Sequence, residues 1–297
     1  MKISCCWMYA IGTYGFPPRI EEMIKAIGEM AALGFKYIEL EGVGYDNLNA
    51  VIANKELLKA ECEKCGVQVV NFAPLLPAII SMDKKEQKKA FQHFEQGVKV
   101  ARYFGSPRVW IDSYNPPLQM VEGSVYTDEL TYGNKMSSRV ISGFSWNKFW
   151  DHFVGVIKEC NDICKENQME LLIEPRVGEV TSNTEGLLRL FDAIPDDNLG
   201  AILDTAHQYA QKESLPLSIA KLGSKIRYVH VADNDGRDNH HYSIGDGTVD
   251  WEGVFLALKE EGYQGYYAID LEKLPNLGAE FIKNKRLLEQ FAERYNL

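Results

Sequence analysis

The chain has 297 residues, of which 45% are hydrophobic and 25% charged, proportions that are ordinary for a folded globular protein with a sizeable core. Its formal net charge of −10 argues against binding to nucleic acid, because that affinity depends on a basic face that neutralises phosphates. No apolar run approaches the roughly 18 to 20 residues that span a bilayer, so we expect neither a nucleic-acid partner nor a membrane segment.

Along the chain, short apolar runs bounded by turn residues alternate with amphipathic stretches, which predicts repeated βα units and a parallel sheet. The runs that we interpret as strands are residues 2–6, 37–41, 67–72, 109–112, 170–174, 200–204, 226–232 and 266–271. The clearest helical spacing lies in residues 20–33, 84–104, 146–167 and 251–261. Glycines that can end a helix with a positive φ stand before four of the strands: Gly34, Gly66, Gly105 and Gly262.

Eight such units without a linker favour closure into a (β/α)8 TIM barrel, an α/β fold that forms one domain over residues 1–297. An open sheet is the alternative. Residues 112–145 interrupt the rhythm, because they contain Pro116 and Pro117, several glycines and no strong helical pattern. We expect a long extra loop after strand four, and connections of this length tend to be functional or to fold into extra elements.

Six cysteines occur in three pairs that are close in sequence: Cys5 and Cys6, Cys62 and Cys65, and Cys160 and Cys164. None of the pairs has a second half at zinc-finger spacing, so we expect reduced thiols and a cytoplasmic location. For the second pair, the end of a helix before Gly66 is our interpretation and a redox or zinc site is the alternative.

Chemistry is expected at the strand ends, because residues at the C-termini of barrel strands converge over one face. Four consecutive predicted strands end in a side chain that can bind a metal: Glu174, Asp204, His230 and Asp270. A buried, unpaired carboxylate costs several kcal/mol, and a shared divalent cation would remove that cost. The pattern therefore predicts one metal site at the mouth of the barrel.

Three carboxylates and one imidazole make an oxygen-rich set, which suits Mn²⁺, Mg²⁺ or Co²⁺ better than a structural Zn²⁺. We expect Mn²⁺ first, with Mg²⁺, Co²⁺ and Zn²⁺ as alternatives. The competing interpretation is that Glu174 and Asp204 only cap strand ends or form ion pairs with Arg176 and Arg237.

The segments LIEP, LDTAH, VHVADNDG, SIGDGTVDW and GYQGYYAID resemble the xylose-isomerase-like barrels, or sugar phosphate isomerases and epimerases. This family includes ketose 3-epimerases and inositol-pathway isomerases and dehydratases, and the resemblance covers nearly the whole chain. It implies that Glu174, Asp204, His230 and Asp270 bind the metal. It also implies that Glu174 and Asp270 move a proton next to a carbonyl, from opposite faces of the substrate, through an enediolate.

The chain departs from the family pattern at strand eight, where the family usually has Glu and this chain has Asp270. A reach shorter by about 1 Å matters for a base that must lie within hydrogen-bond distance of its proton. Asp270 could therefore serve only as a ligand, with Glu174 as the sole base of an isomerase or dehydratase. Glu272, two residues further on, is the reserve candidate.

Further contacts to substrate are assigned to His207, Arg237, Glu41, Trp110 and Trp7. In the family the residue at the position of His207 points at substrate oxygens, and its alternative here is an ordinary residue in the first turn of a helix. Glu39 and Glu41 alternate on strand two, so we expect one of them to point into the barrel and choose Glu41. The tryptophans could stack on a sugar ring or be simple core residues.

We therefore expect a metal-dependent isomerase or 3-epimerase acting on a small sugar or polyol. A dehydratase, or a lyase that cleaves a sugar from an aglycone, is the alternative among enzymes. Residues 237–241 also resemble the Asp-x-His zinc pair of the apurinic endonucleases, but the further histidine ligands of those enzymes are missing after strands three and four.

A barrel without turnover, or one subunit of an assembly that docks through residues 112–145, is the alternative outside enzymes. For the assembly state we expect a homo-oligomer, a dimer or tetramer, with a hetero-subunit as the second choice.

Overall fold

The computed structural model describes residues 1–123 and 137–297. The strands of its main sheet are β1 Lys2–Cys5, β2 Tyr37–Val43, β3 Gln68–Leu75, β4 Arg108–Asp112, β7 Glu170–Glu174, β8 Leu199–Asp204, β9 Ile226–Val231 and β10 Tyr266–Ile269. All neighbours are parallel, and the sheet closes in the order β1-β10-β9-β8-β7-β4-β3-β2. The predicted (β/α)8 barrel is confirmed and the open sheet was wrong.

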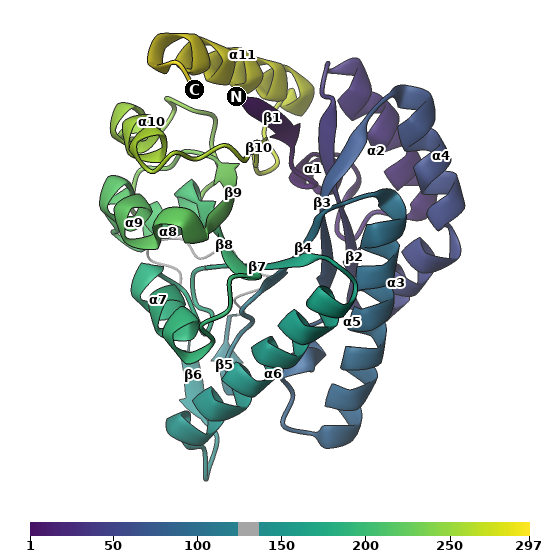
Figure 1. Cartoon of the computed structure of the whole chain (residues 1–297), viewed down its shortest axis with the longest axis vertical. Coiled ribbons are helices and arrows are strands. Elements are labelled where there is room, and N and C mark those ends of the chain that lie inside the picture. The colour runs from purple at the N-terminus through teal and green to yellow at the C-terminus, as the bar shows by residue number, and fades with distance from the viewer. Residues whose placement is uncertain (124–136) are drawn as a thin grey trace.

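Helices surround this barrel (Figure 1). They are α1 Met8–Tyr14, α2 Ile20–Ala32, α3 Gly44–Ala53, α4 Lys55–Cys65, α5 Lys84–Phe104, α6 Trp146–Glu166, α7 Thr184–Ala193, α8 Thr205–Ala210, α9 Leu215–Leu222, α10 Trp251–Glu260 and α11 Leu277–Tyr295, with 3-10 turns η1 Pro77–Ile80 and η2 Gly223–Lys225. Among the described residues, no helix is long and apolar enough to cross a membrane. The chain ends meet where the Met1 amino group donates to the carbonyl of Leu297 at 2.9 Å.

Local chemistry sets the helix ends where the sequence predicts them. Asp83 caps α5 by accepting hydrogen bonds from the backbone N–H groups of Lys85 and Glu86, which satisfies two of the donors that a helix start leaves open. Gly105 ends the same helix with φ 86°, a conformation that a residue with a Cβ adopts only with strain. Gly66 ends α4 in the same way, with φ 68°.

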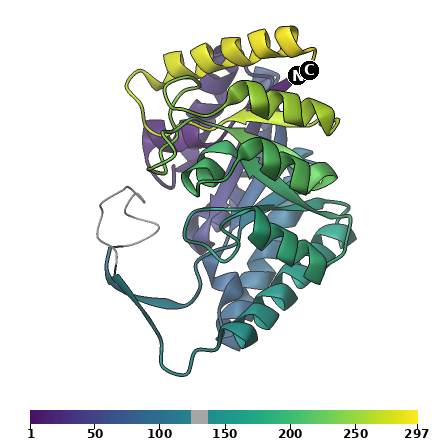
Figure 2. The same cartoon turned by 90° about the vertical axis from the view of Figure 1, so that its left-hand side faces the viewer.

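The segment between β4 and α6 contains more structure than the predicted loop. Strands β5 Leu118–Glu122 and β6 Ser137–Val140 pair in antiparallel fashion, and Figure 2 shows them beside the main body of the barrel. Most of their residues are exposed, so little apolar alternation marks them in the sequence. Residues 124–136 of the predicted loop lie outside the described residues.

The six cysteines are free thiols. Cys62 and Cys65 lie in the last turn of α4, directly before Gly66. The predicted helix end is therefore confirmed for this pair.

The side chains of the strands alternate between the barrel interior and the surrounding helices, as the two-residue period of a strand requires. The interior holds one apolar cluster: Cys6, Val70, Ala73, Leu75, Trp110, Leu172, Ile202, Tyr228 and Ala268. The last five members of this cluster, from Trp110 to Ala268, are each followed two positions later by a polar side chain on the same interior face. These polar residues are Asp112, Glu174, Asp204, His230 and Asp270. The fold thus places five polar side chains in one layer above an apolar floor.

Candidate active site

Three of the four predicted metal ligands converge on a ring nitrogen of the fourth, His230. Nδ1 of His230 lies 2.5 Å from Oε1 of Glu174, 3.7 Å from Oδ2 of Asp204 and 3.9 Å from Oδ2 of Asp270. Strand register explains part of this arrangement, because Asp204 and His230 are paired across β8 and β9. The predicted set is therefore one cluster in space.

The opposite side of the His230 ring is held by a residue outside the predicted site, Glu39. Nε2 of His230 donates to Oε1 of Glu39 at 3.0 Å, and Glu39 is fully buried on β2. A carboxylate in this position fixes the orientation of an imidazole and leaves its other nitrogen for a metal. Trp110 packs edge-on against the same ring, with centroids 5.6 Å apart.

Two carboxylate oxygens of the cluster have no hydrogen-bond partner among the described residues: Oδ2 of Asp204 and Oδ1 of Asp270. Both side chains are almost fully buried, at 1% and 4% exposure. Unpaired carboxylate oxygens at such depth are costly. The residues present therefore fit a divalent cation, and the ligand atoms of Glu174, Asp204 and His230 lie within 4.8 Å of one another.

Burial and mutual charge shift the protonation of the cluster. Burial raises the pKa of Glu174 to about 7, although the neighbouring His230 acts in the opposite direction. Burial alone would lower the pKa of His230, but Glu39 and Glu174 hold it well above its ordinary value. The shift of His230 shows that the neighbouring carboxylates favour a positive charge on its ring.

Within residues 1–123 and 137–297, two other groups of side chains could hold a metal, and both are poorer sites. Cys6, Glu39 and His230 form one of them, but Glu39 already uses the ring nitrogen on that side. Burial also raises the pKa of the Cys6 thiol, which disfavours the thiolate that binds metals.

The second alternative consists of Asp204, His207 and His241. Nε of Arg176 donates to Nε2 of His207 at 3.3 Å, and a guanidinium in this place opposes a second cation. Burial lowers the pKa of His207 to about 3, so its ring is neutral and can accept that hydrogen bond. The group around His230 is therefore the better metal site.

His241 approaches the cluster from the loop after β9. Its Nδ1 lies 3.0 Å from Oδ2 of Asp270 and 3.2 Å from the backbone oxygen of Asp270. Burial acts to lower the pKa of His241, but Asp270 and Asp204 together raise it to about 9. Asp270 is thus shared between the His230 cluster and a charged histidine.

A second set of charges lies beside the first, around Arg176. Nη1 of Arg176 donates to Oδ2 of Asp112 at 2.9 Å. Glu179 accepts from the hydroxyl of Ser113 and the backbone N–H of Tyr114, at 3.1 and 2.8 Å. The ion pair that the sequence allowed for Arg176 is thus formed with Asp112 instead of Glu174 or Asp204.

Above both charge sets opens a cavity of about 480 Å³. Its lining combines the polar groups with an apolar wall, and contains Cys6, Met8, Ile11, Phe16, Glu41, Val43, Leu75, Pro77, Trp110, Asp112, Asn115, Glu174, Arg176, Val177, Glu179, His207, His230, Asn239, His241, Asp270 and Glu272. A cavity of this kind, apolar with convergent polar groups, is typical of small-molecule sites.

The predicted substrate contacts divide between this cavity and other places. Glu41, His207 and Trp110 line it, whereas Trp7 and Arg237 are absent from the lining formed by the described residues. Trp7 is 1% exposed and packs in the main hydrophobic core, because it stands at the start of α1. Arg237 is exposed, and its role stays a prediction.

The choice between Glu39 and Glu41 rested on a wrong premise. Residues two apart on a strand point to the same face, and both side chains are buried, at 0% and 5% exposure. Glu39 contacts His230 and Glu41 lines the cavity. Glu272 also lines the cavity, but it accepts hydrogen bonds from the backbone of His241 and from Nδ1 of His240.

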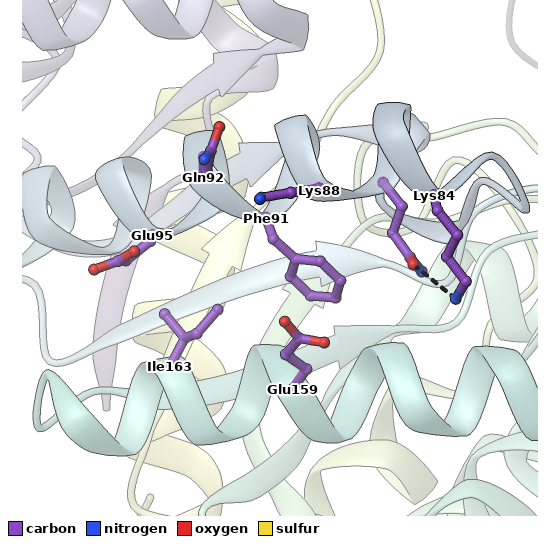
Figure 3. A pocket seen from close by; sticks show the side chains of 8 residues that line it. Lys84, Lys88, Phe91, Gln92, Glu95, Glu159 and Ile163 are labelled. Carbon is purple, nitrogen blue, oxygen red and sulfur yellow. Dashed lines mark hydrogen bonds between the residues drawn. The ribbon is translucent and has the colours of Figure 1, made fainter.

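The outer wall of the barrel has a separate groove between α5 and α6 (Figure 3). It is lined by Lys84, Gln87, Lys88, Phe91, Gln92, Glu95, Glu159 and Ile163. Its volume of about 470 Å³ is similar to that of the mouth cavity. However, it lies on the helix side of the wall and shares no residue with the polar layer inside the barrel.

Comparison with known proteins identifies one family model, described as xylose isomerase-like TIM barrel, which matches residues 27–290. The chain is similar to fructoselysine 3-epimerase of Escherichia coli O157:H7, with 26% identity over 148 residues that span 48% of this chain and 54% of the relative. It is also similar to inosose dehydratase of Serratia proteamaculans, with 22% identity over 291 residues that span 90% of this chain and 89% of the relative. The match thus spans about half of the epimerase and most of the dehydratase.

Solved structures show the same fold. A D-tagatose 3-epimerase-like protein superimposes with a TM-score of 0.75 at 20% identity, covering 100% of this chain and 98% of the other. A structure described as the IOLI protein with a binding zinc atom superimposes with a TM-score of 0.71 at 16% identity, covering 99% of both chains.

Proposed function

This chain belongs to the xylose isomerase-like TIM barrel family, and we propose that it is a divalent-metal-dependent sugar or polyol isomerase or epimerase. It would move a proton at a carbon next to a carbonyl. The observation that carries this proposal is the convergence of Glu174, Asp204 and Asp270 on Nδ1 of His230 at the floor of a ligand-sized cavity.

The metal would be held by Glu174, Asp204, His230 and Asp270, with Glu39 fixing the ring of His230. When bound, a divalent ion supplies a Lewis acid that stabilises negative charge developing on substrate oxygens. We propose Mn²⁺ first, because three carboxylates and one imidazole form an oxygen-rich set. Zinc is the main competitor, since a structural neighbour is described with a zinc atom.

Glu174 is proposed as the base that removes the proton. Its side chain lines the cavity from the end of β7, so it can approach a bound ligand. Trp110 and His207 line the same space and would orient the substrate, and proximity of this kind contributes much of the rate of a proton transfer. The buried floor also keeps bulk water away from the reacting carbon.

Epimerisation also needs a residue that donates a proton to the opposite face of the substrate carbon, and Asp270 is the proposed donor. A lyase, such as a dehydratase, is the second candidate because Oδ2 of Asp270 is already 3.0 Å from Nδ1 of His241. This contact occupies one oxygen of Asp270 and would leave Glu174 as the sole proposed base. The similarity to an inosose dehydratase over 90% of this chain supports the same alternative.

The deciding experiment is to incubate the Mn²⁺-loaded protein with a panel of ketoses and inososes in D2O. Isomerisation or epimerisation conserves mass apart from deuterium uptake, whereas dehydration removes one water, so NMR and mass spectrometry separate them. Glu174→Gln is expected to abolish deuterium uptake, while Glu159→Gln in the outer groove is the matched control. Deuterium uptake by the Glu174→Gln variant at the normal rate would refute Glu174 as the base.

We also propose that the chain forms a homo-oligomer through the β5–β6 pair. Four large apolar side chains there are exposed by 38% to 64%: Leu118, Val121, Val140 and Ile141. Leu118 is paired with Val140 across β5 and β6, and exposed apolar groups that lie together mark contact surfaces. Light scattering should give a smaller mass for a Val121→Ser, Val140→Ser double variant than for the unaltered chain, and an equal mass would contradict the proposal.

A further inference from the structure

We propose that Arg176 binds the substrate and makes the contact that the sequence predicted for Arg237. This inference rests on the proposed function, because it adds a substrate contact to the same site. The contact is a hydrogen bond from Nη2 of Arg176 to a hydroxyl oxygen of the sugar or polyol. Asp112 and His207 are the positioning residues that hold the guanidinium for this contact.

Arg176 lies beside the proposed base. It follows Glu174, the last residue of β7, by two positions, and both side chains line the mouth cavity. Among the described residues of the lining, Arg176 is the sole arginine, whereas Arg237 is exposed and absent from that lining. A guanidinium donor for the substrate is therefore supplied by Arg176 and not by Arg237.

Two hydrogen bonds hold the guanidinium and leave one of its nitrogens for a ligand. Nη1 donates to Oδ2 of Asp112 at 2.9 Å, and Nε donates to Nε2 of His207 at 3.3 Å. An arginine and a carboxylate often form two parallel bonds, but Oδ1 of Asp112 has no partner among the described residues. Neither bond uses Nη2, which carries two N–H donors, and the arginine side chain is 34% exposed. Nη2 is therefore available to an oxygen in the cavity.

His207 supports this arrangement and is itself engaged on both sides of its ring. Its Nε2 accepts from Arg176, so its Nδ1 carries the proton and donates to Oδ1 of Asn239 at 2.9 Å. A ring with both nitrogens occupied has none to offer to a sugar hydroxyl. His207 therefore orients the substrate through Arg176.

The loop that carries Arg176 is fixed to the segment after β4. Glu179 accepts hydrogen bonds from Oγ of Ser113 and from the backbone N–H of Tyr114, at 3.1 and 2.8 Å. The backbone N–H of Val180 donates to the carbonyl of Tyr114 at 3.0 Å. A donor on a loop held in this way loses little conformational entropy when a ligand binds. The guanidinium is thus preorganised for its contact.

The ion pair with Asp112 sets the kind of oxygen that Arg176 binds. Asp112 is 2% exposed, so its charge is little screened by water and offsets the charge of the guanidinium. The contact should then be about equally strong before and during the reaction. Such uniform binding lowers KM and leaves kcat unchanged. We therefore assign Nη2 to a hydroxyl oxygen away from the carbon at which the proton moves.

The test measures binding to the Mn²⁺-saturated full-length protein by calorimetry, with D-fructose, D-tagatose and scyllo-inosose as probes. Arg176→Met is expected to raise the dissociation constant of the tightest-binding probe by about tenfold or more. Arg176→Lys keeps a charge beside Asp112 but lacks the guanidinium fork, so it should keep the fold and still bind the probe about tenfold more weakly. Arg189→Lys, at an exposed position of α7, is the matched control. Full binding by the Arg176→Lys variant would overturn the proposal, because the arginine would then act only as an ion-pair partner.

Single-deoxy analogues of the same probe identify the contacted hydroxyl. The loss caused by Arg176→Met should disappear, to within about twofold, for the one analogue that lacks this hydroxyl. Losses of equal size for all analogues would overturn the proposal.

Asp112→Asn tests whether Asp112 acts through the arginine. It should weaken binding by about threefold in the unaltered chain and add nothing in the Arg176→Met background. Asp192→Asn, at an exposed position of α7, should change binding in neither background. Additive losses from Asp112→Asn and Arg176→Met would overturn the positioning role.

Turnover separates this proposal from the proposed function. With a probe that takes up deuterium, the Arg176 variants should raise KM and change kcat by less than about threefold, and a fall in kcat at unchanged KM would overturn the assignment to a hydroxyl. Deuterium uptake together with normal binding by both Arg176 variants would overturn the substrate contact and leave the proton transfer intact. Weakened binding by these variants, without deuterium uptake or loss of water in the unaltered chain, would overturn the proposed function and leave the contact intact.

Discussion

Replacement of Glu39 by glutamine tests the metal site through a residue that we do not place among its ligands. The carboxylate accepts a hydrogen bond from Nε2 of His230 at 3.0 Å in a fully buried position. Glutamine keeps the size and one acceptor oxygen but loses the negative charge. It can also rotate its amide N–H towards the ring, which would favour the wrong tautomer of His230.

The size of the effect follows from the charge of this hydrogen bond. A hydrogen bond to a charged group contributes about 1.5 to 3 kcal/mol, and 1.4 kcal/mol corresponds to a factor of ten in affinity. We therefore expect the dissociation constant for Mn²⁺ to rise about 10- to 100-fold, which is the range found for carboxylates that orient metal-bound histidines.

The assay is competition for Mn²⁺ against a chelator of known affinity, with circular dichroism to show that the fold is intact. Glu41→Gln is the matched control, since it makes the same change on the same face of β2 but the structure gives Glu41 no contact with His230. It should leave Mn²⁺ affinity within about twofold. If folded Glu39→Gln protein binds Mn²⁺ as tightly as the unaltered chain, the proposed metal site around His230 is wrong.

Removal of the metal should lower the free energy of unfolding by about 2.7 kcal/mol when Mn²⁺ had been present at a hundred times its dissociation constant; equal urea midpoints with and without chelator would contradict this. Arg176→Met should lower the free energy of unfolding, measured in urea, by about 1–2 kcal/mol, because it leaves Asp112 buried and unpaired. The loss is limited because the arginine side chain is 34% exposed. Gly97→Ala should destabilise by about 1–3 kcal/mol, because its Cβ would lie 2.6 Å from Cβ of Pro74. Gly155→Ala on α6 has open space around the new Cβ and should instead stabilise the protein by up to about 1 kcal/mol. If the melting temperatures of the two glycine variants shift in the same direction, this packing argument is wrong.

The strand-end cluster could be predicted because it depends on two short-range properties of the sequence. Apolar runs locate the strands, and the two-residue period then fixes which side chains face the interior. Leu172 with Glu174, and Tyr228 with His230, follow this rule. Asp112, which ends β4 opposite Glu174, follows the same rule.

The remaining site residues could not be located in this way, because they depend on how loops fold back over the barrel. His241 comes from the segment after β9, and its contact with Asp270 joins residues 29 positions apart. Arg176 could reach several carboxylates from its place after β7, and the choice of Asp112 is a matter of loop geometry. Arg237 shows the converse, since we predicted a contact with substrate, whereas its side chain is exposed and is absent from the described lining of the cavity.

Strand register is the physical link between this fold and its site. On β8 and β9, Ala201 is opposite Ile226, but the pairing then shifts by one residue so that Ile202 is opposite Tyr228. Without that shift, Asp204 would be level with Val229, a core residue on the helix side of the strand. Because a slip of one residue exchanges the two faces of a strand, the shift brings the carboxylate of Asp204 and the imidazole of His230 to one level inside the barrel. An interior apolar pair, Ile202 and Tyr228, lies directly beneath them and stabilises the same register by packing.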